Sequence, residues 1–107
     1  MNNQNRVLGL IGIAMKAGKI SFGTESVKEA TLKKKAKLVI IAKNGSDRLK
    51  KEFIQLCEKC KVPIAIFCTI EQISQAIGKQ NKAVICIKDK NLSEEIYKII
   101  CGGEAIG

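Results

Sequence analysis

Short apolar runs rich in β-branched residues alternate along this chain with segments of helical periodicity, and this alternation limits the folds open to it. The runs with strand character cover residues 20–22, 37–42, 64–67 and 83–87. Helices are predicted over about 7–15, 24–34, 46–60 and 69–77, and from 91 onward. Because strands and helices that alternate pack in layers, we predict an α/β fold with a mostly parallel or mixed sheet and helices on both faces.

Polar residues at capping positions predict where several of these helices begin. Ser46 can cap the third helix, and Thr69 with Gln72 has the spacing of a capping box before the fourth. Asn91 and Glu94 have the same spacing and are predicted to begin the last helix.

The length and the apolar content of the chain suit one compact domain. With 107 residues, of which 46% are apolar, we expect a single domain over residues 1–107. No run approaches the roughly 18 apolar residues of a membrane span. Glycines and lysines interrupt the N-terminal apolar stretch, and no small-residue cleavage site follows it. We therefore expect a cytoplasmic protein with no membrane segment, and we take it to be a monomer.

The five cysteines do not predict a metal site or a disulfide framework. Cys57 and Cys60 form a CxxC, but zinc would need a second pair or histidines at ligand spacing, and the chain has no histidine. A redox pair belongs at a helix start, whereas this pair falls at the end of a helical pattern. We predict that the cysteines are small buried hydrophobes and that the protein holds no metal or other cofactor.

The sequence offers no catalytic constellation. It contains no Ser/His/Asp or Cys/His set and no carboxylate pair within an apolar segment. The stretch "AGK", residues 17–19, is not a phosphate-binding loop, because Ile13 stands where the first glycine belongs and Ile20 replaces the Ser/Thr that would bind magnesium. It also leaves a helix and enters a strand, which is the reverse of a P-loop. We predict that the protein is not an enzyme.

The positive charge is unevenly distributed along the sequence. The chain carries a formal net charge of +9; residues 1–61 contain 14 Lys/Arg and 5 Asp/Glu, while residues 62–107 contain five of each. A basic surface concentrated in this way attracts polyanions and makes their binding salt-dependent. The alternative is a lysine-rich surface that only contacts water.

The stretch "FGTES", residues 22–26, has the context of a helix start that contacts a ligand. A strand ends at Phe22, Gly23 permits a close backbone approach, and Thr24 opens a helix with its first N–H groups pointing outward. The pair Ser26 and Glu29 also fits a capping box, so the start is ambiguous by one turn. Lysines around this segment could flank RNA or DNA through phosphate contacts: Lys16, Lys19, Lys28, Lys33, Lys34 and Lys35.

Three stretches of the chain resemble the kink-turn RNA-binding ribosomal proteins of the L-seven-Ae (L7Ae) family, and most closely its small bacterial members. These stretches are "LGLIGIAMKAGKISFGTESVKEATLKKKAKLVIIAKN", "KVPIAIF" and "QAIGK". The resemblance extends from about Asn5 to Tyr97. It implies a three-layer α/β/α sandwich with a central mixed four-stranded sheet and no catalysis. In that family the helix after the matching glycine enters a kinked RNA helix at sheared G·A pairs, and the loop before the last strand covers an extruded base.

The contact pattern of that family, Asn-Glu-x-x-Lys, falls here on Glu25, Ser26 and Glu29, and none of the three matches it. Glu25 can accept a hydrogen bond from a base amino group, and Ser26 can donate or accept one. Glu29 cannot replace a lysine beside a phosphate. Lys28 lies one position early, about 100° around the helix.

We predict a non-catalytic, ribosomal-protein-like protein that recognises structured, kink-turn-like RNA, with ribosomal RNA among the candidate partners. The predicted contacts from the helix start are Gly23, Thr24, Glu25 and Ser26. Phosphates would be neutralised by Lys16, Lys19, Lys28 and Lys43, and the other side would be closed by Lys79, Asn81 and Lys82. The few aromatic residues, mostly at apparent core positions, favour shape recognition over base stacking: Phe22, Phe53, Phe67 and Tyr97. The alternative is a protein-interaction module of the same fold.

Overall fold

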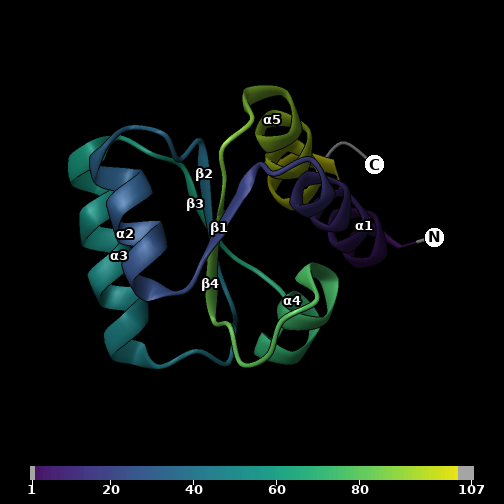
Figure 1. Cartoon of the computed structure of the whole chain (residues 1–107), viewed down its shortest axis with the longest axis horizontal. Helices are drawn as coiled ribbons and strands as arrows, with labels where there is room; N and C mark the ends of the chain where they lie inside the picture. The colour runs from purple at the N-terminus through teal and green to yellow at the C-terminus, as the bar shows by residue number, and fades with distance from the viewer. Residues whose placement is uncertain (1, 104–107) are drawn as a thin grey trace.

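The computed structural model describes residues 2–103 and places a four-stranded sheet between two layers of helices (Figure 1). One layer consists of α1 (Asn3–Lys16), α4 (Ile70–Ile77), α5 (Lys90–Lys98) and the π-helical turn η1 (Ile99–Gly103). The other layer consists of α2 (Thr24–Leu32) and α3 (Asp47–Cys60). This arrangement confirms the predicted three-layer α/β/α sandwich.

The sheet is mixed, with the strand order β1-β4-β2-β3. Its strands are β1 (Ile20–Phe22), β2 (Leu38–Ile41), β3 (Ile64–Ile66) and β4 (Val84–Ile87). β4 runs antiparallel to both β1 and β2, while β2 and β3 are parallel. Every residue of the two central strands is buried, because helices cover both of their faces.

Each face of the sheet has its own apolar core. The core beneath α1, α4 and α5 includes Ile11, Ile40, Ile73, Ile85 and Ile96, all fully buried. The core beneath α2 and α3 includes Val27, Val39, Ile41 and Phe53, also fully buried. Alternate residues of β2 therefore enter opposite cores, as the pleat of a central strand requires.

Two predicted helix caps are confirmed by their hydrogen bonds. The Ser46 hydroxyl accepts a bond from the Leu49 N–H at 3.1 Å and begins α3. Thr69 and Gln72 form the predicted capping box at α4, with bonds of 2.9 and 3.1 Å.

Helices α1 and α5 begin at other residues than predicted, whereas α2 begins at its predicted start. The Asp89 carboxylate accepts the Leu92 N–H at 2.8 Å, so α5 begins at Lys90, and the prediction that Asn91 and Glu94 begin it is wrong. Asn2 caps α1, which therefore starts one turn before the predicted helix. The second helix begins at Thr24 and not at the alternative capping box one turn later.

The cysteines are only partly the buried hydrophobes that the sequence predicted. Cys57, Cys68 and Cys86 are buried, but Cys60 is half-buried and Cys101 is exposed, and all five are free thiols. Burial raises the pKa of Cys57 and of Cys68 to about 11, which keeps both thiols protonated at neutral pH. Within residues 2–103 no group of three potential metal ligands comes together. No helix in that range is long and apolar enough to cross a membrane.

The strand directions create two functionally different ends of the sheet (Figure 1). At the lower end in that view, β1, β2 and β3 finish, β4 begins, and α2 starts. We call this the α2-start end and define it by residues 22–26, 43–46, 67–69 and 78–83. At the upper end β1, β2 and β3 begin and β4 finishes.

Candidate nucleic-acid interface

The start of α2 presents backbone N–H groups without a side-chain cap. Gly23 occupies the N-cap position with φ +86° and ψ 156°, a conformation that is essentially restricted to glycine. Its own N–H donates to the Val84 carbonyl oxygen at 3.0 Å, which fixes the helix start to β4. Because glycine has no side chain to cap the next N–H groups, the first turn of α2 keeps donors and the positive end of its dipole available for an acceptor.

The loop between α4 and β4 lies beside this helix start. Lys79 and Lys82 place their Nζ atoms 5.3 and 5.7 Å from the centre of the Phe22 ring, within the range of a cation–π contact. The hydroxyl of the buried Ser74 accepts the Lys82 N–H at 2.8 Å and donates to the Lys82 carbonyl at 3.3 Å. Asn81, at the exposed tip, has φ +56°. These contacts hold Lys79 and Lys82 next to Phe22, the residue before Gly23.

The segment after β2 completes this end of the sheet. The Lys43 N–H donates to the Cys68 carbonyl at 2.7 Å, and Lys50 Nζ donates to the Lys43 carbonyl at 2.6 Å. The side chain of Asn44 contacts α4 twice: it accepts from the Ile70 N–H at 2.8 Å and donates to Glu71 at 3.2 Å. The backbone is therefore tied down, while Lys43 itself remains exposed.

Two side chains of α2 are already engaged in ion pairs. Lys28 pairs with Glu52 of α3, and this hydrogen bond is the main reason why the pKa of Lys28 is raised and that of Glu52 lowered. Glu29 pairs with Lys33 at 2.9 Å, which lowers the pKa of Glu29. The Glu29–Lys33 pair is exposed and the Lys28–Glu52 pair is half-buried at the surface, so both can exchange partners at little cost. Lys28 nevertheless points toward α3 in the free protein and is not an unpaired cation.

The structure does not bring all the predicted contact residues together. Gly23, Thr24, Glu25 and Ser26 share the α2-start end with Lys43, Lys79, Asn81 and Lys82. Lys16 and Lys19 lie at the opposite end of the sheet, where the Lys19 carbonyl accepts the Lys88 N–H at 2.7 Å. The reason is geometric, because the extended strand between Lys19 and Gly23 separates them by roughly 13 Å at about 3.3 Å per residue.

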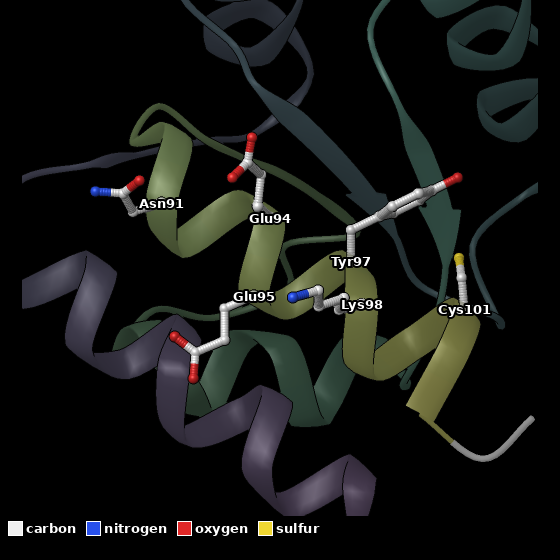
Figure 2. Close-up of a pocket in the computed structure, with 6 residues that line it drawn as sticks. All are labelled: Asn91, Glu94, Glu95, Tyr97, Lys98 and Cys101. Carbon is white, nitrogen blue, oxygen red and sulfur yellow. The ribbon is translucent and has the colours of Figure 1, made fainter. Parts of the chain in front are cut away.

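The aromatic residues are less buried than the sequence suggested. Phe53 is fully buried, but Phe22 and Phe67 are half-buried and Tyr97 is 38% exposed. Tyr97 borders a hollow of about 800 Å³ whose six labelled side chains all come from α5 and η1 (Figure 2). This hollow lies away from the α2-start end and contains two glutamates, Glu94 and Glu95, so it does not favour a polyanion.

Together the fold and the α2-start end define a class of small α/β/α proteins that expose an uncapped helix start beside a lysine-bearing loop. The chain belongs to the ribosomal protein L7Ae/L30e/S12e/Gadd45 family, whose model matches residues 5–97. This confirms the resemblance found in the sequence. The family membership and the relatives described next also confirm that the protein is not an enzyme.

Three relatives illustrate the match. The RNA-binding protein YlxQ of Enterococcus faecium is 32% identical over 100 residues, which cover 94% of this chain and 96% of that protein. The large ribosomal subunit protein eL8 of Thermoplasma volcanium is 30% identical over 96 residues, covering 89% of this chain and 79% of that protein. A solved structure of a Bacillus halodurans protein of unknown function superposes with a TM-score of 0.86 at 27% identity, covering 89% and 96% of the two chains.

Proposed function

We propose that this protein binds structured RNA through the α2-start end and prefers RNA with a kink-turn-like distortion. One observation carries the proposal: the uncapped start of α2 and the loop that holds Lys79 and Lys82 meet around Phe22 in one surface. The RNA-binding and ribosomal names of the relatives support the choice of RNA. In the L7Ae family these two elements contact the kinked helix and an extruded base.

The residues suggest a division of roles on the RNA. The first-turn N–H groups of α2 and the three lysines Lys43, Lys79 and Lys82 contact phosphates and set the position of the RNA. Glu25 and Ser26 face base edges, where a carboxylate accepts from an amino group and a hydroxyl does either. Glu29, where the family has lysine, weakens phosphate binding at that position, and Lys28 can compensate only by leaving Glu52.

Ribosomal RNA is one candidate for the bound RNA, because one relative is a ribosomal subunit protein. We also propose a cytoplasmic location, since that is where ribosomal RNA is bound into ribosomes. Recognition of the shape of the RNA fits this surface better than base stacking, since Phe22 is the only aromatic ring at the α2-start end that has lysines over its face among residues 2–103.

A gel-shift titration tests the proposal. It compares a kink-turn RNA with the same RNA after its G·A pairs are changed to Watson–Crick pairs, each at two salt concentrations. The wild type should bind the kink-turn RNA more tightly. The variant Lys79→Ala/Lys82→Ala should bind it more weakly, with a salt slope smaller by up to about 2. The control Lys51→Ala/Lys98→Ala removes the same charge from two exposed positions on α3 and α5 and should keep the preference.

The outcomes separate the alternatives. Equal binding of both RNAs by the wild type would remove the kink-turn preference and leave a basic surface. A complete lack of binding at low salt would refute RNA binding and favour the protein-interaction module.

A further inference from the structure

The upper end of the sheet gathers lysines from four connecting segments. These segments are 16–19, 33–37, 59–63 and 88–90, and together they define the lysine-rich end. Backbone hydrogen bonds join these segments, directly or through the strand residues beside them: the Lys88 N–H donates to the Lys19 carbonyl at 2.7 Å, the Lys37 N–H to the Ile87 carbonyl at 2.8 Å, and the Val39 N–H to the Pro63 carbonyl at 3.0 Å. The lysines are Lys16, Lys19, Lys33, Lys34, Lys35, Lys37, Lys59, Lys61, Lys88 and Lys90.

These four segments account for the net charge of the whole protein. They contain ten of the 19 basic residues and, in Asp89, one of the ten acidic residues, which gives a formal charge of +9. The remaining nine basic and nine acidic residues cancel. The excess that the sequence assigns to residues 1–61 is therefore, in three dimensions, a property of one end of the sheet.

Most of this charge faces solvent without an acidic partner. Nine of the ten lysines are exposed and Lys88 is half-buried. Among the described residues, only Lys33 of this set forms an ion pair, with Glu29. Lysines from different segments line common hollows of about 200 to 380 Å³. Lys34 and Lys37 meet Lys61 in a hollow without an acidic residue. Lys33 and Lys35 line another with Lys88 and Glu29, and Lys37 lines a third with Lys90 and Glu94.

Helix dipoles explain only part of this arrangement. The C-termini of α1, α2 and α3 lie at this end and carry roughly half a negative charge each, so a few lysines would offset them. Lys88 and Lys90 flank the start of α5, where a cation is unfavourable. Lys34 and Lys61 adopt φ of +61° and +60°, positions where glycine is the favoured residue. Lysine is therefore locally unfavourable at all four positions, because of the helix dipole at two of them and because of the backbone conformation at the other two.

A shallow path along α2 joins the two ends of the sheet. One hollow of about 400 Å³ runs from Glu25 to Lys33, and another of about 200 Å³ includes Ser26, Lys35 and Lys88. Helix α2 has nine residues and is therefore roughly 13 Å long, which is the length of only a few base pairs. An RNA bound at the α2-start end thus needs only a short stem to reach the lysine-rich end.

We propose that the lysine-rich end is a second RNA contact, which binds the backbone of a stem adjoining the RNA held at the α2-start end. This inference rests on the proposed function for the direction of the stem. The contacts are to phosphates, so they add affinity without reading sequence. A membrane surface is a poorer fit, because interfacial binding needs inserted apolar side chains, and only two of the exposed large apolar residues, Leu32 and Tyr97, border the ten lysines.

The variant Lys34→Gly/Lys61→Gly tests this contact while preserving the fold, because glycine suits both backbone conformations. We compare kink-turn RNAs whose stems have about four or about twelve base pairs. Lengthening the stem should strengthen wild-type binding and steepen its salt slope, because more phosphates are engaged. In the variant this gain should shrink, and the salt slope should be lower by up to about 2. For each lost phosphate contact, the gain in affinity between 1 M and 0.1 M salt should be smaller by roughly eightfold.

The control is again Lys51→Ala/Lys98→Ala, which loses two charges outside the four segments and should keep the stem-length gain. A plain RNA duplex without a kink turn forms a separate arm: its binding should fall in Lys34→Gly/Lys61→Gly and be unaffected in Lys79→Ala/Lys82→Ala. If the kink-turn preference is absent but this pattern holds, the proposed function fails and the second contact stands. If Lys34→Gly/Lys61→Gly binds long stems and duplex like the wild type, or binds only anionic vesicles less well, the second contact is refuted.

Discussion

Replacing Gly23 by alanine should destabilise the protein through the backbone alone. The φ and ψ of Gly23, +86° and 156°, lie in a region that L-residues rarely occupy. Beyond its two chain neighbours, a Cβ added at this position would meet no atom within 4 Å, so overlap with more distant residues adds nothing. The expected loss of unfolding free energy is therefore the local conformational cost, about 2 kcal/mol within a range of roughly 1–3.

Urea and thermal unfolding measure this loss. With a urea m-value of roughly 1–3 kcal/mol/M, the midpoint should fall by about 1 M, and Tm by roughly 8–15 °C. At concentrations where the variant is still folded, its RNA affinity should also fall, because the strained Gly23 positions the N–H groups of α2.

Gly9 provides a matched control of opposite sign. It lies in the exposed interior of α1, where an added methyl group would meet no other atom within 4 Å, so Gly9→Ala should stabilise the protein by about 0.5–1 kcal/mol. If Gly23→Ala unfolds at the wild-type urea concentration while Gly9→Ala is stabilised, the backbone conformation described for Gly23, and the helix start built on it, would be refuted.

Three further predictions concern the loop before β4 and the thiols. Lys79→Ala/Lys82→Ala should weaken RNA binding and leave the urea midpoint nearly unchanged, because both side chains lie over Phe22 at the surface; a large loss of stability would contradict the assigned role. Ser74→Ala should cost about 1–2 kcal/mol in urea unfolding, since the Lys82 N–H loses its acceptor, and an unchanged midpoint would show that the loop is held otherwise. In the native protein at pH 8, the exposed Cys101 should react with a thiol reagent much faster than Cys57. Burial raises the pKa of Cys57 to about 11 and lowers its thiolate fraction, so equal rates would contradict this burial.

Much of the fold could be predicted from the sequence because its local signals agree with the global arrangement. The β-branched run 37–42 became the central strand β2, and the polar residue Ser46 caps α3 as its position suggested. The start of α5 was missed because Asp89 and Asn91 both suit a cap, and only the backbone geometry decides which one is extended before the helix.

The site was less predictable because closeness in the sequence does not imply closeness in space. Lys19 is four residues from Gly23, but β1 carries the two to opposite ends of the sheet. Counting charge along the chain likewise separated Lys88 from Lys19, although a backbone hydrogen bond joins them. The pairing of Lys28 with Glu52 depends on how α2 packs against α3, which no local pattern specifies.

Docking of RNA at the start of α2 can be measured residue by residue from the amide NMR shifts on titration with a kink-turn RNA. The largest shifts should occur in residues 23–26 and 79–82, with smaller shifts in the lysine-rich end that appear only when the stem is long. Shifts confined to the lysine-rich end, with residues 23–26 unaffected at saturation, would contradict this docking.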